Sequence, residues 1–154
     1  MPRYFEDFEI GETWTSKTVM LSQEEMIAYA RQNDPQPMHI DPEKAAASRF
    51  GSIIASGWQI AALSMRLFIE GGGYGDTPVV GLGVDELRWR KPVRPGDRLY
   101  VIREVVSTER SRSKPQYGII RTRVSVRNQN GEDVMTLITL GQVPTRDGTE
   151  ANPA

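Results

Sequence analysis

The sequence predicts an α+β fold in which an antiparallel sheet wraps around one long central helix. Helical signals gather in the first half of the chain, whereas alternating strand patterns fill the second half. Between them lies a stretch that is apolar on most of its sides, with Ile60, Leu63 and Leu67 at helical spacing. A helix with so little polar surface needs a sheet to cover it, and this need defines the expected architecture.

The composition is typical of a globular protein with a balanced charge. The chain has 154 residues, of which 38% are hydrophobic and 25% charged, and its 19 basic and 20 acidic side chains leave a net charge of −1. This balance disfavours a nucleic-acid binder. We expect one domain at residues 1–143 and a disordered polar tail at residues 144–154. With no apolar run of ~20 residues and no secretory signal, the expected location is cytoplasmic, with no membrane partner.

The residue types disfavour several kinds of site. Cys is absent, which removes disulfides, thiolate nucleophiles and Cys-ligated zinc. His39 is the only histidine, so a conventional zinc or non-haem iron site is also disfavoured. We therefore expect no metal and no redox cofactor.

Two short helices are predicted after a weak strand signal within residues 4–20. Ser22 is a typical N-cap, and Glu25 three residues later completes a capping box for a helix over about residues 23–32. Asp41-Pro42 starts the second helix, with a carboxylate at the cap and proline at the first helical position. Gly51 ends this second helix.

The third predicted helix is the longest and should be largely buried. It begins at Ser56-Gly57, after the short apolar link Ile53-Ile54-Ala55, and ends at Gly71-Gly72-Gly73. Ala61, Ala62, Met65 and Phe68 fill in around its apolar stripe.

The second half of the chain predicts four strands, at residues 79–90, 99–106, 118–127 and 132–142. In the third of these, apolar side chains and threonine share one face, and arginines occupy the other, which indicates an antiparallel strand buried on one side. Asn130-Gly131 favours a hairpin turn, and residues 107–116 predict a long polar loop. The open edge of such a sheet suits dimerisation by strand pairing.

A polar segment, Asn33-Asp34-Pro35-Gln36-Pro37-Met38-His39-Ile40-Asp41, separates the first two helices. Its prolines prevent the first helix from continuing. It places a carboxylate, Asp34, five residues before the only imidazole, His39. A stiff polar break between helices is typical of a functional loop rather than of a core.

These residues resemble the MaoC-like dehydratases, which include the R-specific enoyl-CoA hydratases and share the hotdog fold. The resemblance extends from about Phe5 to about Val143. It is carried by the polar segment with Ala45-Ala46-Ala47, by Ile54-Ala55-Ser56-Gly57-Trp58, and by Lys91-Pro92-Val93-Arg94-Pro95-Gly96-Asp97. Three positions depart from the family pattern: Gln36 stands where Asn is usual, Asn33 where Gly is frequent, and Ser56 where many members have His.

The resemblance implies a hydro-lyase that adds water reversibly to a trans-2-enoyl-CoA to give a 3-hydroxyacyl-CoA. It implies that Asp34 and His39 form the catalytic dyad, which would activate the water jointly. The backbone N–H of Gly57, at the head of the long helix, would stabilise the thioester oxyanion. CoA would be present only as part of the substrate, and the resemblance implies a homo-oligomer, at least a dimer.

The remaining candidates have alternative structural roles. We include Gln36, Met38, Ser56, Trp58 and Ser64 as substrate-binding candidates, although core packing is the simpler interpretation for Met38 and Trp58. Asp41 is best explained as a helix cap. A set of basic residues on the later strands fits a solvated face, or else the CoA phosphates, with no single residue favoured: Arg103, Arg110, Arg112, Lys114, Arg121, Arg123 and Arg127.

Two other functions remain open from the sequence. Other hotdog families are acyl-CoA thioesterases, although the Asp34–His39 segment fits a hydratase better. The departures at Asn33, Gln36 and Ser56 also allow a non-catalytic acyl-CoA-binding subunit. That alternative is weakened because both proton-transfer side chains are present.

Overall fold

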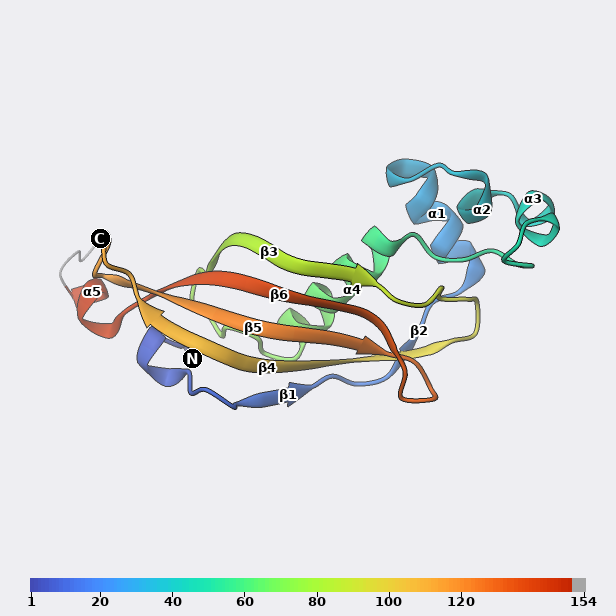
Figure 1. Cartoon of the computed structure of the whole chain (residues 1–154). Coiled ribbons are helices and arrows are strands. Elements are labelled where there is room, and N and C mark those ends of the chain that lie inside the picture. The colour runs from blue at the N-terminus through green and yellow to red at the C-terminus, as the bar shows by residue number, and fades with distance from the viewer. Residues whose placement is uncertain (151–154) are drawn as a thin grey trace.

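The computed structural model describes residues 1–150. One antiparallel sheet, in the strand order β1-β4-β5-β6-β3 with the short β2 also on β4, curves along the helix α4 (Figure 1). This is the α+β hotdog architecture that the sequence predicts. Within residues 1–150, no helix combines the length and apolar character needed to cross a bilayer.

The helical elements divide into a cluster, a central helix and a terminal turn. The 3-10 turn η1 covers Phe5–Asp7, and the helices are α1 Gln23–Asn33, α2 Pro37–Ile40, α3 Pro42–Ala47, α4 Gly57–Glu70 and α5 Arg146–Glu150. The strands are β1 Thr13–Thr15, β2 Val19–Met20, β3 Val80–Trp89, β4 Arg98–Arg110, β5 Tyr117–Arg127 and β6 Asp133–Pro144.

Local signals place the starts of α1 and α3 as expected. The Glu25 amide donates to the Ser22 hydroxyl over 3.1 Å, which satisfies one free N–H of the first turn of α1. The Asp41 carboxylate accepts from the amides of Glu43 and Lys44, both at 3.1 Å. Asp41 therefore acts as a cap.

The core lies between one face of α4 and the concave face of the sheet. Ile60, Leu63 and Leu67 are buried against the inward side chains of β4, β5 and β6, among them Val101 and Val124. The alternation predicted for β5 is present, since Val124 and Val126 are fully buried. Burial of these apolar side chains is the main force that holds the sheet around the helix.

The opposite face of α4 is not covered, in contrast to the expectation of a largely buried helix. Trp58, Met65 and Ile69 are 54%, 41% and 53% exposed. Core packing was therefore the wrong interpretation for Trp58. The sheet reaches one side of the helix only, because β3 is its last strand.

Three segments differ from the predicted elements. The polar segment contains a helical turn, α2, because Pro37 is compatible with the first position of a helix. Strand β4 runs to Arg110, so the predicted loop is shortened. Strand β6 runs to Pro144 and α5 follows it, where an irregular tail was expected; residues 151–154 of that tail lie outside the described residues.

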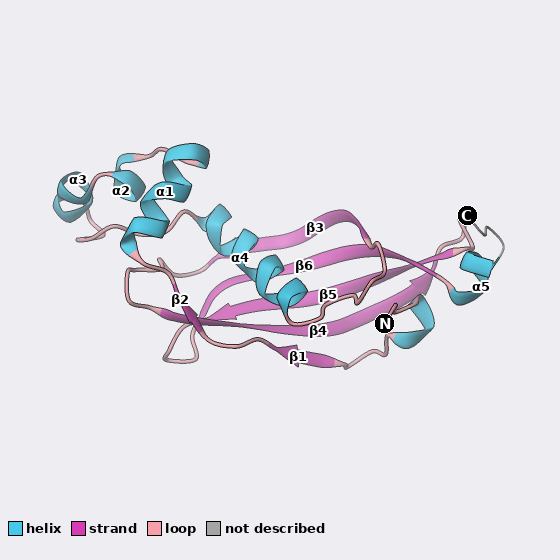
Figure 2. Ribbon diagram, turned by 180° about the vertical axis from the view of Figure 1, so that it is seen from behind, coloured by secondary structure: helices cyan, strands magenta, loops and turns pink. Residues whose placement is uncertain are grey.

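The helical cluster α1–α3 lies at one end of the sheet, beside the start of α4. The N-terminus and α5 lie at the other end (Figure 1, Figure 2). This arrangement brings the polar segment between α1 and α3 to the N-terminal end of the central helix.

Candidate active site

The turn between α1 and α2 brings Asp34 and His39 together. Asp34 ends α1, and its amide still donates to the Ala30 carbonyl over 2.8 Å. The Gln36 amide donates to the Asp34 carbonyl, and the His39 amide donates to the Gln36 carbonyl, at 2.8 and 2.9 Å. These bonds close the chain on itself, so that His39 Nε2 lies 3.3 Å from Asp34 Oδ2.

The His39 ring is fixed by the segment that precedes α4. Its Nδ1 lies 2.7 Å from the Ile54 carbonyl oxygen, and the residue is only 4% exposed. A carbonyl oxygen can only accept a hydrogen bond, so Nδ1 carries the proton. In the neutral ring, Nε2 therefore keeps its lone pair and directs it towards Asp34.

The Asp34 carboxylate is held by two donors. The Gln36 side-chain amide donates to Oδ1 over 2.8 Å, and the Ser56 hydroxyl donates to Oδ2 over 2.7 Å. The bond from Gln36 lowers the pKa of Asp34 most, and burial opposes it. The bond from Ser56 lowers this pKa further, as does the positive charge that His39 carries when its ring is protonated. Asp34 is therefore ionised at neutral pH.

The N-terminus of α4 lies beside the Asp34–His39 pair and, in the described part of the chain, carries a free backbone N–H. Ser56 occupies the N-cap position, but its hydroxyl serves Asp34 and makes no capping bond to α4. Among residues 1–150, the Gly57 N–H has no hydrogen-bond acceptor, as expected for the first turn of a helix. The positive end of the helix dipole lies here.

Gly57 also has a packing role that the sequence did not reveal. A Cβ at this position would lie 2.5 Å from the indole Nε1 of Trp89. The ring of Trp89 in turn meets that of Trp58 edge to face, with centroids 4.9 Å apart. The absence of a side chain at Gly57 thus makes room for the ring of Trp89 at the start of α4.

A cavity of about 400 Å³ opens beside the pair. Its lining includes Asp34, His39 and Gly57. Four large apolar side chains also line it, Met38, Phe50, Trp58 and Trp89, and so do the two basic residues that directly follow β3, Arg90 and Lys91. The size is within the range of small-molecule sites, roughly 300–1,000 Å³.

The structure brings most of the predicted residues to this place, with different contacts for some of them. Gln36, Met38 and Trp58 line the cavity. Ser56 is fully buried behind Asp34. Ser64 is not brought to the cavity, since its hydroxyl donates to the Ala61 carbonyl within α4.

Sequence reasoning missed Phe50 and the group Trp89, Arg90 and Lys91. The available signal was an aromatic residue followed by two bases, directly before the turn-rich segment that starts at Pro92. The basic set that was considered instead does not line this cavity. Several of its members pair with acids on the sheet, such as Arg121 with Asp85, and Arg103 is buried elsewhere.

Comparison with known proteins agrees with the fold. The family model described as MaoC like domain matches residues 7–128. The chain belongs to the MaoC-like family. A relative from Bacillus subtilis, the uncharacterized protein YdeM, is 39% identical over 124 residues, which cover 80% of this chain and 86% of the relative.

Two solved structures are similar to this MaoC-like chain over most of its length. The MaoC-like dehydratase from Rhodospirillum rubrum is 34% identical, with a TM-score of 0.84, covering 94% of this chain and 98% of that one. The (R)-hydratase from A. caviae, involved in PHA biosynthesis, is 26% identical with a TM-score of 0.73, covering 90% and 99%.

Proposed function

We propose that this MaoC-like chain is a hydro-lyase that adds water reversibly to a trans-2-enoyl-CoA, giving a 3-hydroxyacyl-CoA. The observation that carries the proposal is the Asp34–His39 pair, 3.3 Å apart at the wall of an open cavity, with the histidine tautomer fixed by Ile54. The similarity to an (R)-hydratase supports the same reaction class.

The pair is arranged to hold a water molecule. The ionised Asp34 carboxylate and the neutral His39 Nε2 are both acceptors, so they attract each other only through a shared proton or a donor between them. A water in the cavity can donate one O–H to each. Its oxygen lone pairs then face the cavity, where Cβ of the enoyl thioester would lie.

His39 is the group that moves the proton in this proposal. Nε2 takes a proton from the water as its oxygen bonds to Cβ, and the imidazolium then gives that proton to Cα of the enolate. Asp34 remains an anion, because its lowered pKa makes it a poor acid, and it stabilises the imidazolium that forms. Atoms balance, since one water is added across the double bond.

The N-terminal end of α4 receives the charge that develops on the thioester oxygen. The Gly57 N–H has no acceptor in the described structure and borders the cavity. A backbone donor at a helix N-terminus contributes roughly 3 kcal/mol to such a transition state. The chemistry needs no metal or redox cofactor.

The rest of the cavity fits an acyl-CoA. Met38, Phe50 and Trp58 offer an apolar surface to the acyl chain. The one hydrogen bond of the Arg90 side chain within residues 1–150 goes to the Thr136 hydroxyl, so its charge is free for a CoA phosphate. Lys91 lies beside it and pairs with Glu132.

The active form in this proposal is at least a homodimer. Strand β3 is an open edge, and Val80, Leu82 and Val84 on it are 56%, 48% and 53% exposed. They lie near the uncovered face of α4, since the groove between β3 and α4 is lined by Met65, Ile69 and Val84. Pairing of two such edges would cover this apolar surface.

The test is hydration of crotonyl-CoA by the purified chain, followed by the loss of absorbance of the conjugated thioester. His39→Ala and Asp34→Asn should each lower kcat by about 10²–10⁴-fold while the fold persists by circular dichroism. Full activity of His39→Ala would refute the mechanism. Free thiol released from a saturated acyl-CoA would instead indicate a thioesterase, and tight binding without turnover would indicate a binding subunit.

A further inference from the structure

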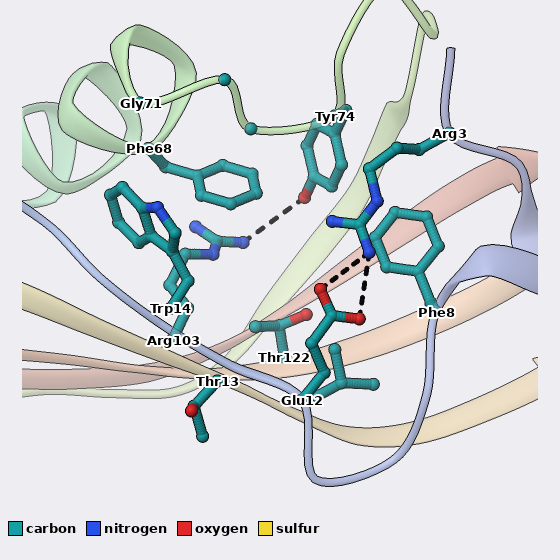
Figure 3. A pocket seen from close by; sticks show the side chains of 13 residues that line it. Arg3, Phe8, Glu12, Thr13, Trp14, Phe68, Gly71, Tyr74, Arg103 and Thr122 are labelled. Atoms are coloured by element: carbon teal, nitrogen blue, oxygen red, sulfur yellow. Dashed lines mark hydrogen bonds and ion pairs between the residues drawn. The ribbon is translucent and has the colours of Figure 1, made fainter. Parts of the chain in front are cut away.

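A second cavity, of about 280 Å³, lies at the far end of α4. Phe68 and the glycines 71–73 at the end of the helix border it, together with Trp14 of β1 and Arg103 of β4 (Figure 3). Because α4 has 14 residues, its two ends are about 20 Å apart. This cavity is therefore separate from the Asp34–His39 pair.

The guanidinium of Arg103 is buried at this cavity without an acidic partner. The residue is 3% exposed, and its guanidinium carbon lies 4.0 Å from the centre of the Phe68 ring. Nη2 donates to the hydroxyls of Thr139 and Tyr74, at 3.2 and 3.4 Å. Nε is buried with no partner, and within residues 1–150 no carboxylate forms an ion pair with this side chain.

A buried arginine in this state is unusual. Burial lowers the pKa of Arg103, yet a guanidinium keeps its proton in proteins, so the charge remains. Charges removed from water are almost always paired, because an unpaired one loses its hydration and gains nothing in exchange. Two neutral hydroxyls and one aromatic face offset only part of that loss.

The end of α4 does not supply the missing negative charge through a hydrogen bond. The carbonyls of Leu67, Ile69 and Phe68 accept from the amides of residues 71, 72 and 73 in turn, at 3.0, 3.1 and 2.9 Å. The last turn is thus capped by its own backbone.

The other cation at the cavity is already neutralised. Arg3 donates to both oxygens of Glu12, at 2.7 and 3.0 Å, and stacks over Phe8 (Figure 3). The cavity therefore has one uncompensated positive charge. A monoanion matches this charge, whereas a phosphate dianion or a nucleotide would bring more negative charge than the site can balance.

We propose that this cavity binds a small organic monocarboxylate, with its carboxylate on the guanidinium of Arg103. Arginine suits a carboxylate because its planar fork matches the two oxygens. The body of the ligand would lie among aromatic rings, since Trp14 meets Phe68 edge to face with centroids 5.3 Å apart and Phe68 meets Tyr74 at 4.9 Å. The volume is too small for CoA and suits a ligand of the size of benzoate.

The test uses benzoate as the probe and benzamide as its uncharged counterpart, with the full chain followed by thermal unfolding and by calorimetric titration. Benzoate should raise the Tm in a concentration-dependent way, and benzamide should not. Arg103→Met should weaken benzoate binding at least tenfold. Arg123→Met, which removes an exposed arginine of β5 that pairs with Glu104, should bind as the wild type does.

A second variant should change the affinity for benzoate in the opposite direction. Glu12→Gln removes the partner of Arg3 and leaves a second cation at the cavity, so benzoate should bind more tightly than to the wild type. Arg103→Lys keeps the positive charge but loses the planar fork of the guanidinium, so this variant should also bind benzoate more weakly than the wild type. It serves in place of Arg103→Met if Arg103→Met fails to fold.

Three results would overturn the proposal: an equal response to benzamide, undiminished benzoate binding by a folded Arg103 variant, or tighter binding of inorganic phosphate than of benzoate. The outcome is independent of the hydration assay, because neither Asp34 nor His39 lies at this cavity.

Discussion

Ser56→Ala is the most informative single change at the candidate active site. It removes one hydroxyl, which donates over 2.7 Å to the same Asp34 oxygen that faces His39. The remaining contacts of Asp34 stay in place, since the Gln36 amide holds the other oxygen. We expect the pKa of Asp34 to rise and the carboxylate to lose one of its two constraints.

The size of the effect follows from the hydrogen bond that is lost. A hydrogen bond to a charged group contributes about 1.5–3 kcal/mol. If all of it is felt in the transition state, kcat/KM falls by about 10- to 150-fold, since each 1.36 kcal/mol is a factor of ten. Asp34 is 18% exposed, so a water that replaces the hydroxyl would bring the loss towards the lower limit.

The assay has two parts, the rate of enoyl-CoA hydration and an NMR titration of the Asp34 carboxyl group. The pKa of Asp34 should be higher in Ser56→Ala, because the carboxylate loses one of the two donors that stabilise its ionised form. Ser64→Ala is the matched control, since it removes a hydroxyl within α4 that donates only to the Ala61 carbonyl. An unchanged pKa of Asp34 together with an unchanged kcat/KM in Ser56→Ala would refute the role of the Ser56 hydroxyl in holding Asp34 as the ionised partner.

Further predictions concern packing, assembly and pH. Gly57→Ala should lower the free energy of unfolding, measured in urea, by about 1–3 kcal/mol, because the added Cβ meets the ring of Trp89. In the Trp89→Ala background the same substitution should cost less, and an equal cost in both backgrounds would contradict this reasoning. Leu82→Glu should convert the proposed dimer to a monomer in light scattering, and a wild type that is already monomeric would rule out the edge pairing. Ser22→Ala should lower the free energy of unfolding by about 0.5–2 kcal/mol and leave the pKa of Asp34 unchanged. The folded state lowers the pKa of Asp34 below its ordinary value of 3.8, so the ionised carboxylate stabilises the fold fully above pH 3.8. This stabilisation is lost as the pH falls through the lowered pKa of the folded state. The difference in free energy of unfolding between wild type and Ser56→Ala should therefore vanish in acid.

Much of the fold could be predicted because its signals are local. The cap at Ser22, the Asp41-Pro42 start of α3 and the alternation along β5 each depend on residues close in sequence. The length of β4 and the end of β6 could not be predicted in the same way. Both strands continue for as long as a neighbour offers paired backbone groups, and Arg110 pairs with Gly118 while Pro144 pairs with Tyr117.

The candidate site was predicted in part for the same reason. Asp34 and His39 lie five residues apart, and a proline-braced turn brings them together. Gln36 and Ser56 were identified as substrate-binding candidates; in the structure both donate to Asp34, and Gln36 also lines the cavity. The direction of a side chain depends on the rotamer and on its neighbours, which the residue type alone does not specify.

The sequence by itself determined the α+β architecture, the starts of the helices and the pairing of the only histidine with a carboxylate, because each follows from periodicity, capping and short spacing. Only the tertiary structure decided what Ile54 and Ser56 do at that pair, that the ring of Trp89 packs over Gly57, and that Arg103 is buried without an acid. Those contacts join residues 15 to 36 positions apart. They form only when these segments pack against one another, because burial then removes water and leaves each polar group dependent on the partners it meets.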